Sequence, residues 1–130
     1  MPPSGPIPAP PSRGRLVLVV EDEALLALDL RRRLEWHGWR VLGPAATVAQ
    51  ALRLLEGGEV PDVALLDVNL RGEMVGPVVE RLRVLGVPFV LASAYDDAQL
   101  AAMGLAGVPA VGKPTREQVL LAALARAVRP

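Results

Sequence analysis

The feature that most constrains this chain is a set of short apolar runs that do not alternate with polar residues. Residues 16–20 read LVLVV and residues 63–66 read VALL, so Val, Leu and Ala follow one another without a polar break. A strand that is apolar on both sides belongs in a sheet whose two faces are both covered, as in parallel sheets flanked by helices. The chain is therefore expected to fold as layers of helix, sheet and helix.

Segments with helical spacing lie between the apolar runs, for example the stripe of Leu26, Leu30 and Leu34. Five strands are predicted to alternate with five helices, which indicates a flavodoxin-like, doubly wound α/β fold with a parallel sheet in the order 2-1-3-4-5. Thr47 is predicted to cap the second helix, and Thr115 to cap the last one with Gln118 as its capping-box partner. The predicted strands are residues 15–20, 39–43, 63–68, 88–92 and 108–111, and the helices are 23–37, 47–56, 75–85, 96–103 and 115–128.

The length of the chain fits one domain with a tail. Of 130 residues, 52% are hydrophobic but only 3% are aromatic, so the core must consist of Val, Leu and Ala. Residues 1–14 are dominated by Pro and are predicted to form a flexible or polyproline-like tail, with docking to an aromatic groove as the less favoured alternative. Residues 15–130 are predicted to form the domain.

Composition also excludes several classes of partner. The 14 basic and 14 acidic residues cancel, so no basic excess favours nucleic acid or an anionic membrane. Cysteine is absent, which excludes disulfides and thiolate sites. Because no apolar stretch approaches the roughly 20 residues of a membrane span and no signal peptide is recognisable, we expect a cytoplasmic protein.

Acidic residues follow two of the predicted strands. Glu21 and Asp22 come directly after the first strand, and Asp67 ends the third. In a doubly wound sheet, ligands bind beyond the carboxyl ends of the strands where the strand order reverses, so these carboxylates are expected to meet. They would repel one another unless a cation such as Mg²⁺ joined them, with Asp22 and Asp67 as direct ligands, Glu21 acting through water and the backbone carbonyl of Asn69 completing the set.

Two further strand ends carry groups that suit phosphoryl chemistry. Lys113 follows the fifth strand and could pair with a phosphoryl group, and Ser93 ends the fourth strand and could hydrogen-bond a phosphoryl oxygen. Asp67 would be the nucleophile that forms an acyl phosphate. Each residue alone has an ordinary structural explanation, such as a turn, a cap or a surface position. Together, at four strand ends, they favour a metal-assisted phosphoryl site.

These motifs resemble the signature of bacterial response-regulator receiver domains (CheY-like). The resemblance rests on residues 19–23 (VVEDE), residues 65–70 (LLDVNL), Ser93 and the pair Lys113-Pro114, and it covers residues 15–130. It implies that Asp67 is the phosphoacceptor, that Glu21 and Asp22 are metal-site acids and that the Lys113–Pro114 peptide is cis.

The same resemblance suggests the partners. It implies a phosphoryl donor that is a sensor histidine kinase or a phosphotransfer protein. It also implies altered protein contacts, with a homodimer as one form of them, through the face of the fourth helix, fifth strand and fifth helix. Since the last predicted helix ends the chain, we expect a stand-alone receiver with no DNA-binding output domain.

Two departures from the family pattern concern signalling. Many receivers carry Tyr or Phe three residues before the lysine, where this chain has Ala110. Residues 91–95 (LASAY) resemble instead the Phe-Ala-Thr-Gly-Tyr type (FATGUY) motif of an atypical subgroup, which often pairs with sensor kinases of the HWE or HisKA2 class. Tyr95 is then either a substitute signalling residue or an aromatic at the rim of the site.

Two rival functions follow from the same residues. The missing aromatic at Ala110 leaves open a pseudo-receiver, an interaction module without phosphotransfer. An aspartate-nucleophile phosphohydrolase usually needs a second aspartate two residues after the first, where this chain has Asn69, which cannot transfer that proton. The phosphohydrolase is therefore the weakest of the three readings.

Other conspicuous residues are expected to be structural. His37 lies at the far end of the first helix, and the basic run 31–33 on the same helix is expected to be solvated. Trp36 and Trp39 are expected to close the end of the core. The sequence does not decide whether Leu100, Met103 and Leu105 are core residues or an exposed patch for a partner.

Overall fold

A computed structural model describes residues 14–113 and 115–128 of the chain. Five parallel strands form one sheet in the order β2-β1-β3-β6-β7, which confirms the predicted flavodoxin-like order. The predicted tail lies outside the described residues except for Gly14. The strands are β1 (Leu16–Val20), β2 (Arg40–Ala45), β3 (Val63–Asp67), β6 (Phe89–Ser93) and β7 (Ala110–Gly112).

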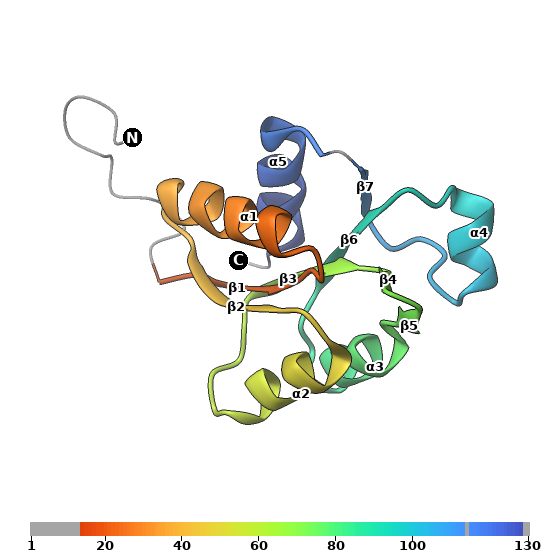
Figure 1. The fold of residues 1–130 in the computed structure, drawn as a ribbon, viewed down its shortest axis with the longest axis horizontal. Coiled ribbons are helices and arrows are strands. Elements are labelled where there is room, and N and C mark those ends of the chain that lie inside the picture. The colour runs from red at the N-terminus through yellow and green to blue at the C-terminus, as the bar shows by residue number, and fades with distance from the viewer. Residues whose placement is uncertain (1–13, 114, 129–130) are drawn as a thin grey trace.

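The helices cover both faces of the sheet, as the apolar strands predicted. In Figure 1, α1 and α5 lie on one face and α2 and α3 on the other, with α4 further from the sheet. Among the described residues, no helix is both long enough and apolar enough to cross a bilayer. The helices are α1 (Ala24–Trp36), α2 (Val48–Glu56), α3 (Gly76–Leu85), α4 (Asp97–Ala102) and α5 (Glu117–Ala127).

Alternate residues of β1 supply the two halves of the core. Leu18 and Val20 pack with buried residues of α2 and α3, whereas Val17 and Val19 pack with buried residues of α1 and α5. All four side chains are almost completely buried, and burial of each is worth about 1.5 to 3 kcal/mol. The apolar character of both strand faces thus fixes the central position of β1 between two helical layers.

The register of the outer strand β2 depends on a glycine. The pairing of β1 with β2 shifts between Leu18 and Val20, next to Gly43, whose φ is +96°. A Cβ at this position would lie 2.8 Å from the Ala45 backbone nitrogen and 3.0 Å from the Val19 carbonyl oxygen. Only glycine fits both the backbone conformation and the space, and the strand continues beyond its predicted end at residue 43.

Two of the helix caps are built from side chains. Thr47 accepts a hydrogen bond from the Gln50 N–H at 3.1 Å, which confirms the predicted cap of α2. At α4, Asp96 and Gln99 form a reciprocal capping box.

The predicted cap of α5 is wrong. Arg116 stands at the cap position of that helix and makes no side-chain cap hydrogen bond. The hydroxyl of Thr115 donates instead to the Gly112 carbonyl. The helix begins at Glu117, so Thr115 lies too early in the chain to cap it, and Gln118 has no capping-box role.

A small hairpin between β3 and α3 was not predicted. Its strands, β4 (Asn69–Leu70) and β5 (Glu73–Met74), pair antiparallel around the two-residue turn Arg71-Gly72. The Gly72 N–H donates to Asn69 Oδ1 at 2.6 Å, and Glu73 Oε1 accepts from the Val48 N–H at the start of α2, at 3.1 Å. These bonds fix the hairpin at its turn and to a neighbouring helix.

The structure also settles which uncertain apolar residues belong to the core. Leu100 and Leu105 are buried, while Met103 remains 36% exposed. Trp39 packs in the core beneath α1 and α5, whereas Trp36 is 37% exposed, so only one of the two tryptophans closes the core as expected.

Candidate functional site

The polar residues singled out from the sequence lie at the carboxyl ends of four neighbouring strands. Glu21 and Asp22 follow β1, Asp67 ends β3, Ser93 ends β6 and Lys113 follows β7. Because these strands run parallel and lie next to one another in the sheet, all four ends face the same edge. This edge is where a doubly wound sheet binds its ligands.

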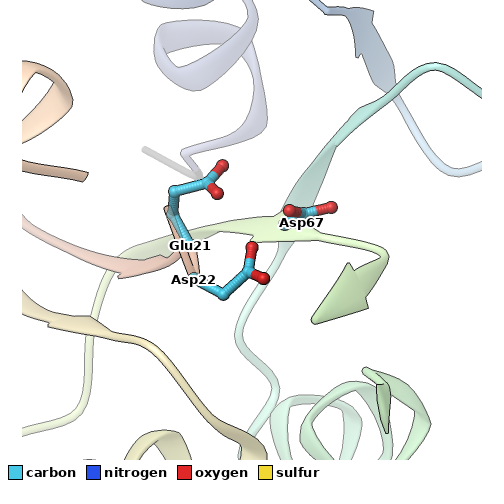
Figure 2. A group of neighbouring side chains, drawn as sticks. All are labelled: Glu21, Asp22 and Asp67. Atoms are coloured by element: carbon cyan, nitrogen blue, oxygen red, sulfur yellow. The ribbon is translucent and has the colours of Figure 1, made fainter. Parts of the chain in front are cut away.

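Three carboxylates gather at this edge, as the topology predicted. One oxygen from each of Glu21, Asp22 and Asp67 lies within 4.8 Å of the other two, and Figure 2 shows the three side chains at the ends of their strands. Glu21 is 3% exposed and Asp67 is 8% exposed. Ionised acids that are so close and so poorly hydrated repel one another, and a cation among them relieves this repulsion.

Lys113 supplies one such cation. Its Nζ donates to Asp67 Oδ2 at 2.8 Å and to Glu21 Oε1 at 3.0 Å, so the ammonium links two acids from different strands. Burial acts to lower the pKa of Lys113, but its hydrogen bonds to Asp67 and Glu21 and the negative charges of these two acids together outweigh burial and raise that pKa above the ordinary value. Lys113 therefore remains charged at neutral pH.

The buried Glu21 is only partly compensated. Burial raises the pKa of its carboxyl group above the ordinary value, although the Glu23 N–H, 3.0 Å from Glu21 Oε2, and the Lys113 ammonium act in the opposite direction. The net rise means that these two partners do not fully offset the loss of hydration of the ionised carboxylate. A second cation at the cluster would stabilise it.

The donor atoms fit a hard divalent cation. The cluster consists of carboxylates alone, without a nitrogen or sulfur ligand, and Mg²⁺ prefers oxygen ligands and keeps several waters. The incomplete compensation of Glu21 points in the same direction. The residues present are therefore compatible with a magnesium ion.

A chain of hydrogen bonds joins the loops after β3 and β6. The Asn69 N–H donates to Asp67 Oδ1 at 3.2 Å, and Asn69 Nδ2 donates to the Tyr95 hydroxyl at 3.4 Å. The Tyr95 N–H in turn donates to Ser93 Oγ at 2.8 Å. These bonds connect Asp67 to the segment that precedes α4.

The same residues line an open hollow of about 400 Å³. Asp67 and Lys113 are on its wall together with Ser93 and Tyr95, so a small anionic group that enters the hollow meets a carboxylate, an ammonium and a hydroxyl. Tyr95 is partly buried and lines this hollow, and its role as a substitute signalling residue stays a prediction.

Arg71 is the site residue that the sequence analysis missed. Its Nε lies 3.2 Å from Asp22 Oδ2, and it lines the hollow beside Asp67. A turn residue four positions after Asp67 gives no periodic signal. The dipeptide Arg71-Gly72, so soon after a strand that ends in Asp, was the available hint of a tight turn over the site.

The remaining residues that the sequence analysis singled out lie away from this cluster or, in the case of Pro114, outside the described residues. His37 follows the last residue of α1, and its Nε2 lies 3.4 Å from Glu117 Oε2 at the start of α5. Arg31 and Arg33 pair with acids of α1, as expected of a solvated helix face. Ala110 is exposed. Because Pro114 lies outside the described residues, the predicted cis peptide before it stays a prediction.

Comparison with protein families gives a match to one of them. A family model described as "Response regulator receiver domain" matches residues 17–125. The "Positive alginate biosynthesis regulatory protein" of Pseudomonas aeruginosa is 33% identical over 117 residues, which are 88% of this chain and 47% of that protein. The phyllosphere-induced regulator PhyR of Methylorubrum extorquens is 31% identical over 83 residues, 62% of this chain and 31% of that protein. The chain thus spans less than half the length of these curated relatives.

Among solved structures, the chain is similar to response regulators as well. The receiver domain of the Erythrobacter litoralis response regulator PhyR, solved by NMR, has a TM-score of 0.77 and 27% identity, and the match covers 87% of this chain and 88% of that one. The response regulator PhyR from Brucella abortus has a TM-score of 0.76 and 28% identity over 87% of this chain and 47% of that chain.

Proposed function

The chain belongs to the response-regulator receiver family, the phosphoacceptor modules of two-component signalling, and from that premise we propose that it accepts a phosphoryl group on Asp67 and in response changes its contacts with other proteins. One observation carries the proposal most directly: a buried Asp67 carboxylate lies beside two other acids and 2.8 Å from the Lys113 ammonium, on the wall of an open hollow.

Each residue at the edge has a role in the proposed transfer. An oxygen of Asp67 attacks the phosphorus atom of a phosphohistidine, the phosphorus–nitrogen bond breaks, and the imidazole of the donor leaves with the electron pair. Lys113 pairs with the arriving phosphoryl oxygens as a point charge. Ser93, whose Oγ accepts from the Tyr95 N–H, retains its own hydroxyl hydrogen to donate to a phosphoryl oxygen.

Glu21, Asp22, Asp67 and the backbone carbonyl of Asn69 are the groups proposed to hold Mg²⁺. When bound, such an ion would offset the negative charge of the acids and of the phosphoryl oxygens. The acids themselves keep that position polar, and the hydrogen bonds from the Glu23 and Asn69 N–H groups orient two of the carboxylates.

The proposed output is a change in packing. A phosphoryl group adds a charge of about −2 within reach of Lys113 and Ser93, and the loops after β3 and β6 already share hydrogen bonds through Asn69 and Tyr95. Repacking of these loops with α4 would shift the population between two conformations. The face formed by α4, β7 and α5 is the proposed contact surface, and a second copy of the chain is one of its proposed partners.

The proposed donor is a sensor histidine kinase, or a phosphotransfer protein, in the cytoplasm. Ala110 and the segment 91–95 support placing the chain in the FATGUY-type subgroup, and hence a kinase of the HWE or HisKA2 class.

The test is phosphorylation by a small acyl-phosphate donor with Mg²⁺, followed by a phosphate-affinity gel and intact mass. We expect a shifted band and the mass gain of one phosphoryl group in the wild type, no shift in Asp67→Asn, and a wild-type shift in Asp97→Asn, which changes an exposed acid at the start of α4. An unshifted wild type that nevertheless binds Mg²⁺ would overturn phosphotransfer and favour the pseudo-receiver.

A further inference from the structure

We propose that Arg71 is a displaceable counter-ion for Asp22, which competes with Mg²⁺ and so sets how tightly the acid cluster binds the ion. The inference rests on the metal site of the proposed function. It concerns a residue that the phosphoryl chemistry described above does not use.

The division of the two cations among the three acids is the first argument. Lys113 is shared between Glu21 and Asp67, whereas Asp22 is paired with Arg71, with 3.2 Å between Nε and Oδ2. Asp22 is one of the two acids proposed as direct ligands. Without Arg71, Asp22 would be the one acid of the cluster that has no cationic partner among the residues that the structure describes.

The exposure of the two cations is the second argument. The Lys113 side chain is 27% exposed and held by two buried acids, while the Arg71 side chain is 79% exposed. A solvent-exposed guanidinium can turn into water without losing its hydration, and exposed ion pairs contribute little to stability. Arg71 can thus yield its place to a metal ion far more readily than Lys113 can.

The backbone at Arg71 is the third argument. Arg71 has a φ of +54° and Gly72 a φ of +89°, so both residues of the two-residue turn adopt the left-handed conformation. Asn, Asp or Gly would satisfy the first position of such a turn better than Arg. The turn does not explain an arginine, and the contact that the structure gives its guanidinium is Asp22.

The hairpin fixes the backbone that carries this side chain. The Gly72 N–H donates to Asn69 Oδ1 and Glu73 accepts from the Val48 N–H, so the turn is anchored on both sides of Arg71. A fixed backbone with an exposed guanidinium is suited to a reversible ion pair.

The experiment is titration of the purified chain with MgCl₂ by isothermal calorimetry, in the absence of a phosphodonor. Arg71→Gly removes the charge and favours the turn, Arg71→Lys keeps the charge, and Arg126→Gln removes an exposed positive charge from the last turn of α5 as a matched control. We expect the Kd for Mg²⁺ to fall about two- to fivefold in Arg71→Gly, the range that exposed ion pairs reach. Arg71→Lys should stay near the wild type, and Arg126→Gln should be unchanged.

Salt provides a second readout. At about 1 M NaCl, where the Debye length is roughly 3 Å, the ratio of the wild-type and Arg71→Gly constants should approach one. A change in the turn alone would leave that ratio independent of salt.

Two results would overturn the role of Arg71 while the metal site stood: equal Kd values for wild type and Arg71→Gly, or equal tightening in Arg71→Gly and Arg71→Lys. Failure of every variant to bind Mg²⁺ would overturn the inference together with the proposed metal site. Failure of phosphorylation on Asp67, with these binding results intact, would overturn only the proposed phosphotransfer.

Discussion

At the scale of single residues, the two ion pairs of Lys113 hold together acids from β1 and β3. Lys113→Met should lower the free energy of unfolding by about 1 to 3 kcal/mol in EDTA, because Glu21 and Asp67 would stay buried without their cation. Urea denaturation measures the change. Adding Mg²⁺ should restore part of the loss, since another cation then enters the cluster, and an unchanged urea midpoint in EDTA would contradict this account.

Glu21 gives a prediction about pH. Its pKa is higher in the folded chain than the ordinary value of 4.5, chiefly because it is buried. Between these two values the folded state binds more protons than the unfolded state, so this residue's contribution to stability falls as the pH rises. Glu21→Gln lacks this titration. In EDTA, the free energy of unfolding of Glu21→Gln should therefore rise relative to that of the wild type as the pH increases from about 4.5.

The measurement is urea denaturation of both proteins at a series of pH values from about 4 to 7, a range that spans the ordinary carboxyl pKa values. Glu56→Gln, an exposed acid at the end of α2, is the matched control and should follow the wild type. A constant difference between Glu21→Gln and wild type across the range would show that burial does not disfavour the ionised form.

At the scale of elements, Thr47 and Thr115 looked alike in the sequence but differ in the structure. Thr47→Ala should cost about 1 kcal/mol in the free energy of unfolding, because it removes the acceptor of the Gln50 N–H at the start of α2. Thr115→Ala should cost about 0.5 kcal/mol or less, because it removes a hydrogen bond to the Gly112 carbonyl at a partly exposed position rather than a cap. Chemical denaturation compares the two, and equal losses would contradict the assignment of the caps.

The sequence predicted the five strands of the main sheet and the five helices because apolar runs and helical stripes are long, repeated signals. It missed the β4–β5 hairpin because strands of two residues each are too short to show periodicity. It misplaced the cap of α5 because Thr115 and Gln118 have the spacing of a capping box, while the helix begins only at Glu117. Where a helix begins depends on tertiary contacts that local spacing does not contain.

At the scale of the whole molecule, topology rather than local sequence brings the site together. The cluster of Glu21, Asp22 and Asp67 could be predicted because strand ends converge at one edge of a parallel sheet. Arg71 could not, since its contact with Asp22 depends on a tight turn and on the direction of a long side chain. The roles proposed for the cluster, for Ser93 and for Lys113 stay predictions until phosphorylation and metal binding are measured.

Because the acids follow two adjacent central strands, metal binding should stabilise the entire domain rather than one loop. A ligand that binds only the folded state adds RT ln(1 + [L]/Kd) to the free energy of unfolding, about 1.4 kcal/mol for each tenfold rise in free Mg²⁺ well above the Kd. Urea denaturation over a series of MgCl₂ concentrations, at ionic strength held constant with NaCl, measures this slope. Asp22→Asn should flatten the slope, whereas Asp97→Asn should keep it. If Mg²⁺ raised the free energy of unfolding of Asp22→Asn as much as that of the wild type, the ion would be acting on general surface charge. The edge formed by β1 and β3 would then not be its site.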